Sequence, residues 1–445
     1  MVHHVEVAAN ALTAEDLLKG TFGTAGHFNT NVYPSDQMLT FVASVIGNEE
    51  IARGTYFRSG AQLMDIVAQL VEWKFGSFDK VEAFLDFASG YGRLTRFLVQ
   101  QLPADRIWVS DIQANAVAFQ VEQLGVHGFL SEMNPADLDR AGEFAEKFDC
   151  IFVASLFSHL PERTFIPWLR KLYSMLKPDG LLMFSVHDEI LLDPSYQMPE
   201  SGFIFREDSE IAELDTRDYG VTFVTEAFVS KAVEEATGGR TAYHRIRRMM
   251  YLQDLYVLVK SDQPDFSGLK FEYGAGGTVD YCYWRRRDEL CVNGWTVDIT
   301  PGSAIKEITF FVNGEVRQKC MPYLRRPDVR THFKDEAFLY SGWECFCRVP
   351  GGTDTDLLTV TARTTTGNEY LLYAGSIAAI LRPGAGDEAS LSSMADPAYI
   401  DQMESTLERK NLALLGLEGY ARRLEAELKE ARTPKLPWKR RTGSA

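Results

Sequence analysis

Hydrophobic residues along this chain repeat in different ways, and the changes divide the sequence into segments. From about residue 80 to 260, apolar runs alternate with stretches of helical spacing; the runs are at 83–87, 107–110, 150–154, 181–186, 221–224 and 252–259. The clearest helical stretch has Phe165, Trp168, Leu169 and Leu172 at i, i+3, i+4 and i+7. Such alternation predicts an α/β domain over residues 76–262, whose parallel sheet has helices on both faces.

The flanking segments have other patterns. Residues 1–75 contain helical spacing, most clearly at 62–73, and are predicted to form a helical cap. Residues 261–270 have the composition of a linker. From 271 to 380, short strand-like runs are separated by turns, and Asn313-Gly314 is a strong signal for a hairpin, with Thr366-Gly367-Asn368 marking a second. We therefore predict an antiparallel β-sandwich over 271–380.

A heptad pattern follows near the C-terminus. Apolar residues recur from Ile400 to Leu428, and Lys410 breaks the register. This spacing predicts a coiled coil over 398–432, through which residues 400–428 would form a homo-oligomer. The alternative is that the apolar seam docks on the chain's own sandwich. A basic tail is predicted over 433–445, as a solvated end.

Charge and composition exclude some classes of protein. The chain has 445 residues and a formal net charge of −16, which disfavours general binding to nucleic acid. Its six cysteines form no C-x-x-C pair, so we predict reduced thiols rather than a zinc site. The N-terminus lacks the pattern of a signal peptide, and no apolar run is long enough to span a membrane. The predicted localisation is cytoplasmic.

Residues 84–93 carry the most specific motif. They read Phe84-Leu85-Asp86-Phe87-Ala88-Ser89-Gly90-Tyr91-Gly92-Arg93. A strand, a tight turn and a helix in this order bring backbone N–H groups and a carboxylate close to a nucleotide-like ligand. A dinucleotide fingerprint would need a third glycine at position 95, where this chain has threonine. The pattern D-x-G-x-G-x-G fits better, with Ala88 in place of its first glycine.

Together with two later segments, this motif resembles the class I S-adenosylmethionine-dependent methyltransferases. The segments are Phe148-Asp149 with Ser155-Leu156-Phe157-Ser158-His159-Leu160-Pro161, and Leu176-Lys177-Pro178-Asp179-Gly180. The resemblance covers about residues 50–260. It implies a Rossmann-like, seven-stranded, mostly parallel sheet and S-adenosyl-L-methionine as the cofactor. Ala88 and Asp179 depart from the family pattern, because each replaces a glycine.

The resemblance also implies a set of cofactor-binding residues. They are Asp86, Ala88, Gly90, Gly92, Arg93, Asp111, Ile112, Ser155, Tyr56 and Arg58. Asp111 ends the second strand, where a carboxylate can accept hydrogen bonds from ribose hydroxyls; its alternative role is a helix cap. Arg58 is predicted to pair with the cofactor's carboxylate, and its alternative is a surface arginine.

Methyl transfer to a hydroxyl requires a group that removes the hydroxyl proton, and histidine is suited to this near pH 7. His159 follows the fourth strand and His187 follows the fifth, where Asp188 could orient it. Both histidines are therefore candidate bases. The alternative for His159 is a structural role, such as capping the following helix or packing on the cofactor. We identify no cluster of metal ligands.

Three classes of function stay open. The first is a methyltransferase that O-methylates a saccharide or related small-molecule hydroxyl in bacterial surface glycan synthesis. The sandwich motivates this acceptor, because its segments 294–298 and 311–314 resemble immunoglobulin-like modules found with such enzymes; Arg325, Arg326 and Trp343 are its candidate glycan contacts, beside a structural turn. The second is a non-catalytic scaffold with a vestigial methyltransferase domain. The third, an NAD(P)-dependent oxidoreductase, is disfavoured by the missing third glycine. Residues 189–219 are predicted to form part of the acceptor wall.

Overall fold

The computed structural model describes residues 13–23, 28–138, 142–207, 214–239, 242–250 and 253–382. The predicted coiled coil over 398–432, its self-association through 400–428 and the basic tail over 433–445 lie outside these residues. Near the N-terminus are three helices: α1 (Ala14–Phe22), α2 (Gln37–Ile46) and α3 (Glu49–Phe75). None of the described helices is both long and apolar enough to cross a membrane.

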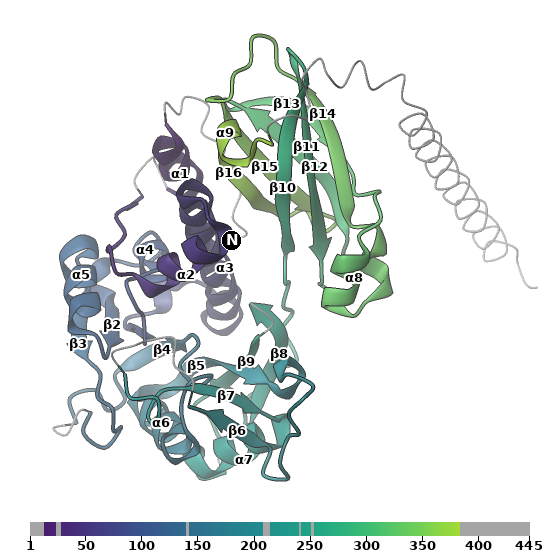
Figure 1. Cartoon of the computed structure of the whole chain (residues 1–445). Coiled ribbons are helices and arrows are strands. Elements are labelled where there is room, and N and C mark those ends of the chain that lie inside the picture. The colour runs from purple at the N-terminus through teal and green to yellow at the C-terminus, as the bar shows by residue number, and fades with distance from the viewer. Residues whose placement is uncertain are drawn as a thin grey trace, which may run out of the picture. The chain divides into compact units, whose positions relative to one another are not determined.

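The predicted α/β domain contains a mixed sheet with a parallel centre (Figure 1). Strand β1 (Phe84–Phe87) pairs in parallel with β2 (Ile107–Asp111) and β4 (Phe148–Val153). Outside these, β3 (His127–Leu130) pairs with β2, and β5 (Leu176–Asp188) pairs with β4. Strand β9 (Gln253–Val259) runs antiparallel to β5 and to β8 (Tyr243–Met250). All parallel strands therefore end at one edge.

The sheet has nine strands in the described residues, not the seven that the resemblance implies. The difference arises because β5 is long. Its residues up to Val186 pair with β9, whereas His187 and Asp188 continue beyond and pair with β7 (Val221–Val224). Strand β6 (Phe203–Arg206) then pairs with β7. The two extra strands extend the sheet at the edge where ligands bind in α/β proteins.

Two hydrophobic cores cover the two faces of this sheet. Successive strand residues point to opposite faces, so Phe84 packs in one core and Leu85 in the other. Helices α3 and α4 (Thr95–Leu98) contribute to the first core. Helices α6 (Glu162–Met175) and α7 (Glu226–Thr237) contribute to the second (Figure 1). Among the other elements, α5 (Ala114–Leu124) follows β2.

Two antiparallel sheets follow, as the strand pattern predicts. The first contains β10 (Ala275–Arg286), β11 (Glu289–Asp298) and β14 (Gly342–Arg348). The second contains β12 (Ile305–Val312), β13 (Glu315–Cys320), β15 (Leu357–Thr364) and β16 (Glu369–Ser376). Their inner faces share one core, in which Trp343 is fully buried and donates its indole N–H to Thr296 Oγ1 at 2.9 Å. Trp343 is therefore a core residue and offers no ring to a glycan.

Two small helices complete this part of the chain, α8 (Pro327–Phe333) and α9 (Ile377–Ile380). Arg326, just before α8, forms ion pairs with Asp280 at 2.6 Å and Asp328 at 2.7 Å. Its guanidinium is therefore occupied by a structural turn, the second of the two roles expected for it.

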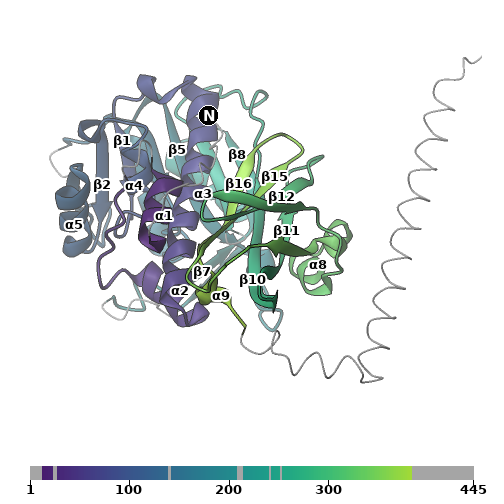
Figure 2. The same cartoon turned by 90° about the horizontal axis from the view of Figure 1, so that it is seen from above.

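The long helix α3 contacts both the mixed sheet and the sandwich, and α1 and α2 lie beside it (Figure 2). Gln69 exchanges two hydrogen bonds with the backbone of Glu272, at 2.9 and 2.8 Å. The segment over 261–270 is not a free linker, because Phe266 stacks on Trp73 of α3 with ring centroids 5.6 Å apart. The apolar residues of this segment thus join the first core.

Candidate functional site

A cavity of 740 Å³ lies where the parallel strands end. The turn after β1 lines it with residues 86–91, the end of β2 with residues 111–113, and the loop after β4 with residues 154–156 and His159. Residues 34–38, 40, 41 and 44, including part of α2, also line it, as do Leu214, Asp218 and Tyr219. The last three are the contribution of the predicted acceptor wall; the other described residues of 189–219 do not line the cavity.

A hydrogen-bonded network holds the glycine turn. Thr95 Oγ1 lies 2.8 Å from Asp86 Oδ2 and 2.7 Å from Gln120 Oε1, and Gln120 donates from Nε2 to Gly90 O at 2.8 Å. Thr95 is the residue that stands where a dinucleotide fold needs glycine. Burial raises the pKa of Asp86 to about 7, although the hydrogen bond with Thr95 and the charge of Arg93 oppose this shift. Thr95 and Gln120 carry no motif by themselves, and the sequence did not single them out as site residues.

Asp111 closes the turn from the second strand. Its Oδ2 accepts from the backbone N–H of Gly90 at 2.8 Å, and its Oδ1 accepts from that of Gln113 at 3.0 Å. Burial raises the pKa of this carboxyl, and these backbone N–H groups partly offset the rise. Each oxygen keeps a further lone pair, which suits a carboxylate that lines the cavity and accepts hydrogen bonds from a diol.

Two non-glycine residues have left-handed backbone conformations among the described residues that line the cavity. Ala88 has φ of 55° and Ser155 has φ of 60°. For residues other than glycine this conformation costs about 1–2 kcal/mol, and such strain gathers at functional sites. Alanine in place of the motif's glycine at position 88 thus adds backbone strain as well as one methyl group.

A second network holds Ser155 in place. The backbone N–H of Ser155 donates to Ser185 Oγ at 2.8 Å, and Ser185 Oγ donates to Gln253 Oε1 at 2.7 Å. Gln253 Nε2 lies 3.1 Å from Ser155 Oγ and 3.2 Å from His187 Nε2. Gln253, the first residue of β9, therefore links β5 to the loop that follows β4.

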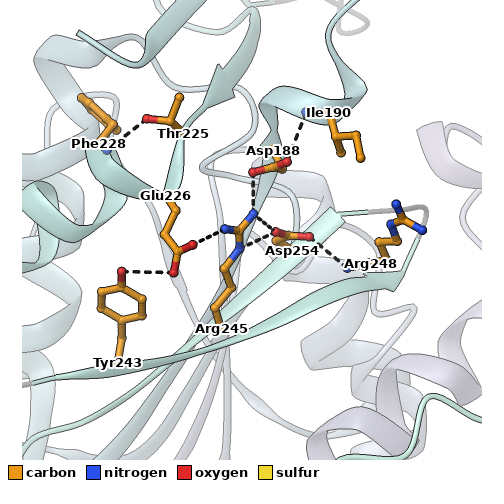
Figure 3. Close-up of polar contacts among 9 residues, drawn as sticks. All are labelled: Asp188, Ile190, Thr225, Glu226, Phe228, Tyr243, Arg245, Arg248 and Asp254. Atoms are coloured by element: carbon orange, nitrogen blue, oxygen red, sulfur yellow. Dashed lines mark hydrogen bonds and ion pairs between the residues drawn. The ribbon is translucent and has the colours of Figure 1, made fainter. Parts of the chain in front are cut away.

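Next to Gln253, the side chain of Arg245 gathers three carboxylates (Figure 3). It pairs with Asp188, Glu226 and Asp254 at 2.5 Å each, and the guanidinium is largely buried. Asp188 is thus held by Arg245 and does not orient His187, as its position in the sequence had suggested. The cluster joins the end of β5, the start of α7 and the hairpin of β8 and β9, and so fixes the base of the loop that begins at Glu189.

The structure brings most of the predicted site residues to one cavity. Those that line it are Tyr56, Asp86, Ala88, Gly90, Arg93, Asp111, Ile112, Ser155 and His159. Gly92 does not; a Cβ there would lie 2.9 Å from Gln120, so its glycine is needed for packing against α5. Arg58 does not either. Tyr56 and Arg58 are two positions apart on α3 and hence on different faces of the helix.

Arg58 instead contacts the sandwich, where its guanidinium donates to Gly277 O at 3.2 Å and to Leu372 O. Contrary to the prediction, Arg58 is therefore not placed to bind a cofactor in this cavity. Arg93, in contrast, does line the cavity. Its Nη1 atom lies 3.4 Å from Ser59 Oγ.

The two candidate bases differ in environment. His159 stacks on Tyr219, and its Nδ1 lies 2.7 Å from Gly220 O. A carbonyl accepts only, so Nδ1 carries the hydrogen and Nε2 is the basic nitrogen of the neutral ring. Burial lowers the pKa of His187 to about 4, with a smaller contribution from His159, and His187 does not line the cavity. Because its pKa is lowered and it does not line the cavity, His187 does not fit the predicted role of general base.

Residues 85–182 match a family model described as a methyltransferase domain. This segment of the chain is therefore similar to a methyltransferase domain. The match spans the glycine turn, Asp111 and His159. It supports S-adenosyl-L-methionine as the cofactor, as the sequence motif predicts. Within the described residues no three metal-ligating side chains gather at one place.

A curated protein also resembles part of the chain. A malonyl-[acyl-carrier protein] O-methyltransferase of Calditerrivibrio nitroreducens is 28% identical over 129 residues, covering 29% of this chain and 46% of that protein. The chain thus spans just under half of the length of that relative.

Solved structures resemble the chain at low identity. An O-methyltransferase family protein from Burkholderia thailandensis has a TM-score of 0.31 and 15% identity, over 45% of this chain and 58% of that chain. A 1,6-didemethyltoxoflavin-N1-methyltransferase from the same organism, with bound S-adenosylhomocysteine, has a TM-score of 0.32 and 16% identity, over 52% and 91%.

Proposed function

We propose that the protein transfers a methyl group from S-adenosylmethionine to a neutral hydroxyl, in the first instance that of a saccharide. The proposal rests on the cavity at the ends of β1, β2 and β4, which is lined by both Asp111 and the strained turn at Ala88. A cofactor with a ribose fits Asp111, because each carboxylate oxygen can accept a further hydrogen bond from a ribose hydroxyl.

The charges of the cavity support a cationic cofactor and a neutral acceptor. Among the described residues that line it, five are acidic: Asp36, Asp86, Asp111, Glu132 and Asp218. Arg93 is the arginine among the described residues that line the cavity. Such a surplus of carboxylates favours a sulfonium and an ammonium group and disfavours a carboxylate as the acceptor. Arg93 would hold the carboxylate of the cofactor's amino-acid part.

His159 is the proposed base. When bound beside Asp111 and Arg93, the cofactor would supply an electrophilic methyl group to the acceptor oxygen. His159 Nε2 takes the hydroxyl proton, while Gly220 O holds Nδ1–H and Tyr219 holds the ring plane. The protein's further contribution is to orient the hydroxyl and to keep water away from the methyl group.

Two measurements test the proposal. Calorimetric titration with S-adenosylhomocysteine decides between an enzyme and a scaffold, and an absence of binding would favour the scaffold. A panel of saccharide acceptors with labelled S-adenosylmethionine then tests the reaction. With a substrate found, we expect His159→Ala to lower kcat by about 10²- to 10⁴-fold. His332→Ala, an exposed histidine of the sandwich region, is the matched control.

The outcomes for His159→Ala separate two roles. A lower kcat with unchanged affinity for S-adenosylhomocysteine supports a base. Full turnover, or a loss confined to cofactor affinity, assigns His159 to packing and refutes the base.

A further inference from the structure

Helix α2 is an apolar surface element beside the cavity. Its sequence, Gln-Met-Leu-Thr-Phe-Val-Ala-Ser-Val-Ile, has no charged residue, yet none of its ten residues is buried. Phe41 is 53% exposed and Val45 is 71% exposed. Exposed apolar residues gathered on one element mark an interaction surface more often than scattered ones do.

The helix is held firmly, so its exposure is not the fraying of a loose end. Asp36 caps it, accepting from Met38 N–H at 2.9 Å and Leu39 N–H at 3.1 Å through Oδ1. The other oxygen of Asp36 accepts from the buried Tyr56 hydroxyl of α3 at 2.7 Å. Met38 and Leu39 also pack against the first core. One edge of α2 is thus anchored, and the opposite edge faces solvent.

This surface continues into the cavity. Met38 and Phe41 line the cavity that holds Asp111 and His159, and Phe41 is also exposed at its rim. Met133 also lines the cavity and is 41% exposed. An apolar path therefore runs from Phe41 in the cavity wall to Val45, which is exposed one helical turn further along α2.

We infer that the acceptor carries a hydrocarbon portion beside its hydroxyl-bearing group, and that Phe41 and Val45 of α2 bind this portion. This inference rests on the proposed function. The polar end of the acceptor would lie at His159, and its hydrocarbon portion would follow the path past Phe41. The cofactor does not explain the surface, since its proposed contacts lie at the turn after β1 and at Asp111.

Other occupants fit α2 less well. Helices that bind anionic membranes carry lysine and arginine on their polar face, whereas α2 has neither and the chain has a net charge of −16. A stable contact between two copies of the chain needs roughly 1,000 Å² or more, beyond what one short helix edge supplies. A hydrocarbon chain needs only a strip of apolar side chains.

Chain-length dependence tests the inference. The full chain is saturated with S-adenosylhomocysteine, and binding of methyl, butyl and octyl β-glucoside is measured by calorimetry below micelle-forming concentrations. We expect affinity to rise about two- to fourfold per added methylene, as for partial to full burial of each group. Phe41→Ser and, separately, Val45→Ser should flatten this series. Val316→Ser, a residue 54% exposed on β13, should leave it unchanged.

Each result decides the matter. No dependence on chain length in the wild type overturns the inference, as does an equal dependence in all variants. Co-sedimentation with phosphatidylglycerol vesicles that depends on Phe41, with a flat glucoside series, would assign the surface to a membrane and also overturn it. The proposed function fails separately, by an absence of S-adenosylhomocysteine binding in the first titration.

Discussion

Asp86 should make cofactor binding depend on pH. Its side chain is buried beside the glycine turn, and burial raises its pKa to about 7. A cofactor that brings positive charge should favour the carboxylate form. If only this form binds, the competent fraction is about 0.09 at pH 6 and about 0.9 at pH 8. We therefore expect affinity for S-adenosylmethionine to fall about tenfold from pH 8 to pH 6.

Asp86→Asn isolates this effect, because titration of the ligand itself is common to both proteins. Calorimetry across this pH range should show the tenfold change in the wild type only. Near pH 6 the wild type should also release close to one proton on binding, which appears as a dependence of the heat on the buffer. Parallel affinity profiles for the two proteins would refute the reasoning.

The raised pKa of Asp86 should also affect the unliganded protein. Its stability should fall as the pH rises, whereas its affinity for the cofactor should increase. Because its folded pKa lies above its unfolded value, its contribution to stability is present below about pH 4 and is lost as the pH rises through 7. The upper limit of this loss is roughly 4 kcal/mol, from three pH units at about 1.4 kcal/mol each. Urea unfolding of the wild type and Asp86→Asn at pH 5 and 8 measures the difference, and a constant difference contradicts the assignment.

Three further predictions concern the supports of the site. Gln253→Ala should weaken S-adenosylhomocysteine binding about five- to tenfold, since Ser155 loses its support; unchanged calorimetric affinity would contradict this. Asp179→Gly should raise the free energy of unfolding by about 1 kcal/mol in urea, because residue 179, near the start of β5 and away from the cavity, has φ of 62°; no gain would mean that this residue is not strained. Arg58→Ala should lower thermal stability, equivalent to roughly 1–3 kcal/mol, and leave S-adenosylhomocysteine affinity unchanged, whereas a loss of affinity would restore Arg58 to the cofactor site.

Local sequence determined the features that depend on neighbouring residues. The motif from Phe84 to Arg93 folds as a strand and turn because its apolar run and its glycines act within ten residues. Asn313-Gly314 forms the predicted hairpin for the same reason, with both residues at positive φ. The parallel centre and the antiparallel sheets followed from the two periodicities. The immunoglobulin-like character of the sandwich stays a prediction.

The tertiary structure decided what depends on residues far apart in the chain. Strand β10 was not predicted, because Gly276 and Gly277 disfavour a strand until β11 pairs with them. Tyr56 and Arg58 lie on different faces of α3, so Tyr56 lines the cavity and Arg58 contacts the sandwich, although the sequence predicted both as cofactor ligands. Gln253 reached Ser155 across 98 positions only because β9 inserts beside β5. A sequence motif specifies the turn that holds a cofactor, whereas packing decides which distant side chains complete the site.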